Sequence, residues 1–225
     1  MKRASKFLST NEQERITHAV VEAESKTAAE ILPVLASTSG RYDRAEDVAG
    51  IWLGIIAMGV TWVAMQPQGA ETAQWGSTWA RFELPLLVLA MIAGAMLGTL
   101  VATFSWTLRR LFTPKKHMTA EVEMRAGQVF YDRRVHHTQS AAGVLVYISL
   151  FERTAAVLAD EAALKALGQD GIDTLRDNLI NGIKAGDLAT AVCDVIRDAG
   201  DRLAKDLPAE EGDRDELKNA LVTIE

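Results

Sequence analysis

Three aspartates are the residues of this chain best suited to chemistry. Asp160 directly follows the apolar segment 154–159, and Asp170 and Asp173 lie further along the helical sequence that comes next. Carboxylate oxygens are the ligands that calcium and magnesium prefer, so Asp160, helped by Asp170 or Asp173, is a candidate calcium or magnesium site. The spacing differs from the D-x-D-x-D-G pattern of calcium loops. Asp160 is also well placed to cap a helix that begins near Glu161.

Glu152 and Arg153 form a second candidate polar cluster, in the turn of a predicted β-hairpin. They lie at the opposite end of that hairpin from Asp160, so the two groups are not expected to share a site. A turn ion pair and a contact to a helix end both remain open for them.

The other reactive side chains predict structure rather than catalysis. Cys193 falls on or beside the apolar face of its helix, as a core thiol does. His136 and His137 are neighbours, which on a helix point about 100° apart and do not share a metal ion. The sequence has no G-x-x-x-x-G-K-S/T phosphate loop. The catalytic residues therefore stay unknown.

Composition narrows the class of protein. The 225 residues carry a net charge of −6, which argues against a nucleic-acid surface. One cysteine cannot form an internal disulfide and suits a reducing compartment. The basic start, MKRASKFLST, lacks the apolar stretch that follows in a signal peptide.

The elements that must position these residues alternate between helix and strand. Ser9 and Glu12 have capping-box spacing, which predicts a helix start. Segment 30–37 is predicted as a buried strand, where Pro33 favours an edge or a bulge. Segments 144–150 and 154–159 predict a β-hairpin. Further helices are expected over 120–138, on both sides of Gly186, and near the end of the chain, where Leu217 and Leu221 would pack.

One strand before position 48 and two after position 117 are too few for separate domains. We therefore predict one α/β domain made of residues 1–47 and 118–225, in which strand 30–37 pairs in parallel with strand 144–150. Residues 48–117 interrupt this domain.

That interruption is predicted to be a transmembrane helical hairpin. Val48–Ala70 and Leu84–Leu108 carry no charge, and a bilayer crossing needs about 20 apolar residues. Helices are expected at about 48–67 and 84–108, followed by a basic juxtamembrane segment. Lys and Arg gather at the outer flanks, which places both termini and the soluble domain in the cytoplasm. Four of these residues are also candidate contacts to anionic lipid, namely Arg109, Arg110, Lys115 and Lys116.

A stripe of small residues recurs every four positions in the second apolar helix: Ala90, Gly94, Gly98 and Ala102. Such stripes let helix backbones approach closely in lipid. Two interpretations stay open, packing within the hairpin and formation of a homodimer. Neither apolar run contains an ionisable side chain, which argues against a transport role.

The soluble sequence resembles the TPM domain family, in particular its bacterial membrane-protein branch. The resemblance covers the T-x-x-E-I pattern of Thr27, Glu30 and Ile31, where Ala28–Ala29 replace the usual serine and glycine. It continues with Arg125, Ala126, Phe130, Thr138, Gly143 to Leu145, Ser149, Leu150, Glu152, Arg153 and Asp160, and with a tail from Gly186 to Leu217. It implies a three-layer α/β/α domain with a small mixed sheet, and a home in the bacterial inner membrane. It also implies phosphatase activity and calcium binding, or auxiliary and quality-control roles beside membrane complexes.

Three functions follow as hypotheses. The first is an auxiliary, regulatory or quality-control interaction module for a membrane-protein partner. The second is a calcium- or magnesium-dependent phosphatase, and the third is a self-associating membrane scaffold.

Overall fold

The computed structural model describes residues 3–66, 80–138, 140–209 and 220–225. It divides the chain into two compact units, Met1–Gly40 with Lys115–Glu225, and Arg41–Pro114. The first, an α/β unit, is interrupted by the second, which is helical. Each unit is described here by itself.

The α/β unit is built on a four-stranded mixed sheet with the order β3-β2-β1-β4. β1 (Glu30–Ala36) and β2 (Gly143–Ser149) pair in parallel, with Glu30 opposite Gly143 and Ala36 opposite Ser149. β2 and β3 (Thr154–Ala159) form an antiparallel hairpin. The predicted parallel pairing and the predicted hairpin are both confirmed.

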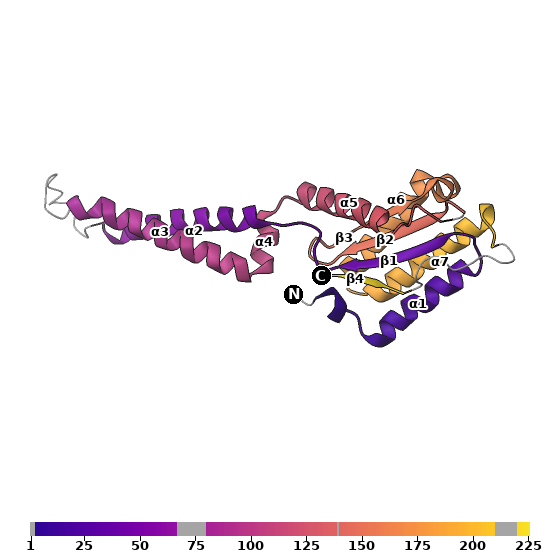
Figure 1. Cartoon of the computed structure of the whole chain (residues 1–225). Coiled ribbons are helices and arrows are strands. Elements are labelled where there is room, and N and C mark those ends of the chain that lie inside the picture. Colours follow the sequence, from indigo (N-terminus) through magenta and orange to yellow (C-terminus); the bar gives the residue numbers. More distant parts are fainter. Residues whose placement is uncertain (1–2, 67–79, 139, 210–219) are drawn as a thin grey trace. The chain divides into compact units, whose positions relative to one another are not determined.

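Helices cover both faces of this sheet (Figure 1). α5 (Lys115–Asp132) packs on one face through Val122, Ala126, Val129 and Phe130, as predicted. α1 (Thr10–Glu24), α6 (Glu161–Ala185) and α7 (Leu188–Asp206) pack on the other. All residues of β1 and β2 are buried, which explains why both strands read as continuous apolar runs rather than alternating ones.

Local signals define the helix ends. Ser9 and Glu12 form the capping box at the start of α1, and the short 3₁₀ helix η1 (Ala4–Lys6) precedes it. Asp160 caps α6, and α6 ends at Gly186, whose φ of 86° is in the left-handed region that glycine adopts easily. Asp187 then caps α7.

The prediction of a final helix is wrong over its described part. Leu221 precedes a short strand, β4 (Val222–Ile224), which pairs in parallel with Val34–Ala36 of β1. Leu217 lies outside the described residues. Val, Thr and Ile favour strands, and β1 offers an edge that this segment fills. Pro33 lies just before the paired stretch, where a missing N–H costs the sheet nothing.

The helical unit contains α2 (Asp43–Ala64), α3 (Ala80–Phe104) and α4 (Trp106–Phe112). Glu46–Ala64 and Glu83–Phe104 are long and apolar enough to cross a membrane, by length and composition. The second helix was expected to continue to Leu108. It ends instead at Phe104, because the chain turns at Ser105 into the separate helix α4.

Candidate functional site

A polar cluster lies at the carboxyl ends of β1 and β2, the edge where parallel sheets usually place their sites. We call it the carboxyl-edge cluster and define it as Ser37, Thr38, Ser39, Tyr147, Ser149 and Glu152. The first three follow β1 and lead toward the start of α2. Ser149 ends β2, and Glu152 lies in the turn before β3.

Glu152 is the centre of this cluster and is only 4% exposed. Its Oε1 accepts hydrogen bonds from the Ser39 backbone N–H at 2.9 Å and from Thr38 Oγ1 at 3.4 Å. Its Oε2 accepts one from Ser149 Oγ. The carboxylate therefore ties the loop after β1 to the turn after β2. Arg153, its predicted neighbour in a polar cluster, is exposed and has a left-handed φ of 51°.

Tyr147 completes the cluster from inside the sheet. The side chain is fully buried, and its hydroxyl lies 3.0 Å from Ser39 Oγ. Burial raises the pKa of Tyr147, the negative charge of Glu152 raises it further, and the contacts with Ser39 and Arg125 oppose the shift. The phenol therefore stays protonated at neutral pH. Together these groups act chemically as a hydrogen-bonded brace at the end of the sheet.

Asp160 lies at the opposite end of the β2–β3 hairpin, since Ala159 pairs with Val144 at the start of β2. Its Oδ1 accepts a hydrogen bond from the Glu161 N–H at 2.8 Å, so the capping interpretation is confirmed. Its Oδ2 is buried and has no hydrogen-bond partner.

The three predicted metal ligands do not form one site. Asp173 pairs with Arg176 at 2.8 Å, and Asp170 lies on α6. Over the described part of the chain, no three His, Cys, Asp or Glu side chains are grouped so that they could hold a metal ion. Calcium takes six to eight oxygen ligands, and magnesium takes an octahedral set. One unpaired oxygen of Asp160 supplies a single ligand, so these three residues alone do not complete a calcium or magnesium site.

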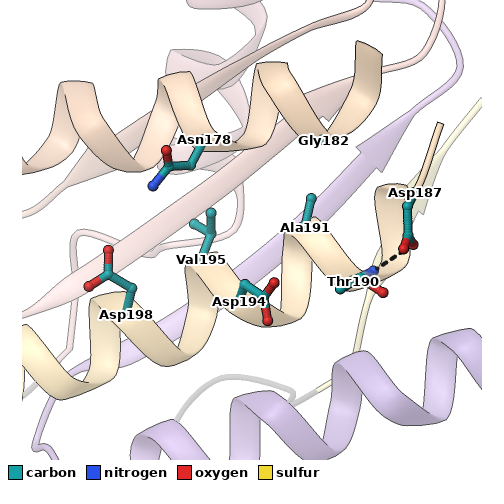
Figure 2. A pocket seen from close by; sticks show the side chains of 8 residues that line it. All are labelled: Asn178, Gly182, Asp187, Thr190, Ala191, Asp194, Val195 and Asp198. Atoms are coloured by element: carbon teal, nitrogen blue, oxygen red, sulfur yellow. Dashed lines mark hydrogen bonds between the residues drawn. The ribbon is translucent and has the colours of Figure 1, made fainter. Parts of the chain in front are cut away.

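A shallow groove of about 430 Å³ lies between α6 and α7 and is lined by Asn178 and Gly182 from α6 and by residues of the start of α7 (Figure 2). Its three carboxylates are Asp187, Asp194 and Asp198. Asp187 accepts a hydrogen bond from the Thr190 N–H at 3.2 Å as a helix cap. Asp198 forms two hydrogen bonds with Arg202, at 2.8 and 2.9 Å. Asp194 forms an ion pair with Arg197 at 3.8 Å, so all three carboxylates are already engaged in local structure.

In the helical unit, the small-residue stripe forms the seam between α2 and α3. A Cβ added to Gly94 would lie 2.6 Å from Ala57 Cβ, and one added to Gly98 would lie 2.9 Å from Gly50 Cα. Ala102 is fully buried. Of the two open interpretations for Ala90, Gly94, Gly98 and Ala102, the structure therefore uses the stripe for packing within the hairpin.

The base of this hairpin is closed by a polar contact that the sequence did not reveal. Arg109 forms an ion pair with Glu46 and donates a hydrogen bond to Thr103 O at 3.0 Å. Thr103 Oγ1 in turn donates to Glu46 Oε2 at 2.7 Å. Arg109, predicted as a lipid contact, is therefore engaged inside the hairpin. Lys115 and Lys116 are exposed and Arg110 is half-buried.

No family model matches the chain, and no curated protein does. Among solved structures, the NMR structure of the BA42 protein from the psychrophilic bacterium Bizionia argentinensis is similar, with a TM-score of 0.59. The match covers 99% of each chain at 20% sequence identity. A likeness at this identity concerns the fold alone.

Proposed function

We propose that this chain is a membrane-anchored, TPM-like α/β module that serves as an auxiliary, regulatory or quality-control partner of a membrane complex. The supporting observation is the surface of the inserted hairpin. Only 17% of the apolar window of α2 and 11% of that of α3 are buried. A core helix of a soluble protein buries most of such a window, so these side chains need an apolar environment from outside the chain.

Large apolar side chains dominate this exposed surface and include Trp52, Ile56, Val60, Leu97 and Phe104. The small residues meet in the seam instead, where close backbone approach is useful in lipid. Each long helix is also long enough to span a bilayer core of about 30 Å at 1.5 Å per residue.

The proposal includes an orientation. Arg41 and Arg44 precede or begin α2, and Arg110, Lys115 and Lys116 follow α3. The positive-inside rule places these flanks, and hence the α/β unit, in the cytoplasm of a bacterium, at its inner membrane.

Anchoring and orientation are tested in intact cells. The full chain should resist extraction by alkaline carbonate. A cysteine at Ser77 should react with an impermeant maleimide from outside, whereas a cysteine at the exposed Asp177 should react only after permeabilisation. Extraction into the supernatant, or labelling of both positions from the same side, would refute the anchor.

The partner role is tested separately, by cross-linking in membranes followed by purification in mild detergent. We expect one membrane protein to co-purify in a fixed ratio with the chain. The control is a chain with the same two helices and an unrelated soluble domain. Equal recovery by chain and control would contradict the partner role while leaving the anchor intact.

A metal-dependent phosphatase is the second proposal, and the buried, unpaired Oδ2 of Asp160 is the observation that favours it. Asp160→Ser keeps a helix-capping oxygen and removes the second carboxylate oxygen. The purified chain is assayed on p-nitrophenyl phosphate with calcium, with magnesium and after chelation. Loss of activity in Asp160→Ser and after chelation would support the enzyme, whereas equal and background rates in all samples would exclude it.

A further inference from the structure

α3 has the length that one crossing of a bilayer requires, and it then stops. Its apolar window, Glu83–Phe104, contains 22 residues, which rise about 33 Å at 1.5 Å per residue. The hydrocarbon core of a bilayer is about 30 Å thick. In the proposed anchor, the turn at Ser105 therefore falls at the depth of the lipid headgroups, and α4 begins there.

The polar contact at the base of the hairpin marks the same depth. Arg109 pairs with Glu46 and also donates a hydrogen bond to the carbonyl of Thr103, in the last turn of α3. Charged side chains are costly inside hydrocarbon, so these groups belong at the polar boundary of the bilayer. Because Arg109 is a residue of α4, the contact holds α4 at that boundary.

The exposed apolar surface of α3 continues up to this boundary. Leu97, Leu100, Val101 and Phe104 recur at helical spacing, and all four are exposed. Phe104, the last of them, is 79% exposed. The lipid that covers this row in the proposed anchor therefore reaches the residue directly before the turn.

α4 carries the apolar surface past the turn. It runs from the end of α3 toward the start of α2, against which it packs (Figure 1). Leu111 is 75% exposed, and Trp106 and Thr107 are exposed as well. The sequence of α4, WTLRRLF, has no acidic residue, and tryptophan is enriched where a bilayer meets water. The composition of α4 thus suits the boundary between lipid and water.

From these observations we propose that α4 is an interfacial helix whose exposed side, with Phe104, Trp106 and Leu111, lies in the headgroup region of a phospholipid bilayer. Interfacial helices bury their apolar side about 5–10 Å deep, at the boundary between headgroups and acyl chains. Seven residues bind a membrane weakly alone, but α3 brings α4 to the surface and so raises its effective concentration there. The inference rests on the proposed anchor and deepens it, because apolar side chains make the lipid contact while Arg109 sets the depth.

Depth-dependent quenching tests this placement in the full chain. Leu111→Cys is labelled with an environment-sensitive fluorescent maleimide and reconstituted into phosphatidylcholine vesicles, while native Cys193 is buried. The vesicles contain lipids that carry a nitroxide either near the headgroup or near the end of the acyl chain. We expect the label at 111 to be quenched more strongly by the shallow nitroxide than by the deep one. Thr107→Cys, one helical turn earlier, gives the same readout if the first variant folds poorly.

Two further positions separate this inference from the anchor. A label at Leu97, exposed within α3, should be quenched more strongly by the deep nitroxide, and a label at the exposed Asp177 should be quenched by neither. If the label at 111 is quenched no more than that at 177 while the label at 97 is quenched, the interfacial helix is refuted and the anchor stands. If the label at 97 also escapes quenching, both are refuted.

Discussion

The hairpin seam gives the sharpest quantitative expectation. A methyl group at Gly94 would lie 2.6 Å from Ala57 Cβ and 2.9 Å from Leu53 O, both far inside van der Waals contact. Overpacking of this kind costs about 1–3 kcal/mol, and replacing glycine by alanine in a helix returns up to about 1 kcal/mol. At the middle of both ranges, Gly94→Ala should therefore destabilise the hairpin by a net ~1.5 kcal/mol.

Gly59 supplies a matched control in the facing helix. A Cβ there has no heavy atom within 4 Å, so Gly59→Ala keeps only the helix-propensity gain of up to about 1 kcal/mol. The full chain, labelled at Arg44 and Leu111 for energy transfer, is unfolded by SDS in mixed micelles. The SDS fraction at half-unfolding should fall for Gly94→Ala and rise for Gly59→Ala. If Gly94→Ala shifts in the same direction as Gly59→Ala, the seam is not where the structure places it.

The remaining expectations concern the α/β unit. Arg153→Gly should raise the thermal unfolding midpoint, because a φ of 51° costs a residue with a side chain about 1 kcal/mol. Glu152→Ala should lower that midpoint by leaving buried donors without an acceptor, at about 1–3 kcal/mol, and calorimetry measures both changes. Hydrogen bonds from Ser5 lower the pKa of Glu225, so β4 docking should be strongest above the usual glutamate range and weaken as pH falls through the lowered pKa. Hydrogen exchange of the β4 amides measures this loss of docking. In Glu225→Gln the protection of β4 should no longer fall as pH falls through this range. Burial raises the pKa of the Cys193 thiol, so maleimide should modify it only after denaturation, as mass spectrometry would show.

Sequence reasoning succeeded where the determining signal is local or strongly patterned. The spacing of Ser9 and Glu12 predicts the start of α1, and Gly186 with Asp187 predicts the break between α6 and α7. The parallel pairing of β1 with β2 followed from topology, because a long connection between two buried strands favours it.

Features set by distant partners could not be predicted in this way. The Glu152 carboxylate accepts a hydrogen bond from the backbone N–H of Ser39, which is 113 positions away in the chain. β4 is a strand because β1 has an open edge, and the sequence around Val222 alone also suits a helix end. The turn at Ser105 interrupts an apolar run without a proline or glycine nearby. Arg109 meets Glu46 and a carbonyl of α3 only after that turn has formed.

The ion pair between Glu46 and Arg109 also bears on the order of folding. The central pair of strands, β1 and β2, must meet across more than a hundred intervening residues, and closing so long a loop is entropically unfavourable and slow. When the helical hairpin closes at its base, it joins its own entrance and exit. The effective loop then shrinks to the stretch from Ala36 to Glu46 and the stretch from Arg109 to Gly143. The second strand, once synthesised, would then lie close to the first, so damage to the hairpin base should delay maturation of the α/β unit.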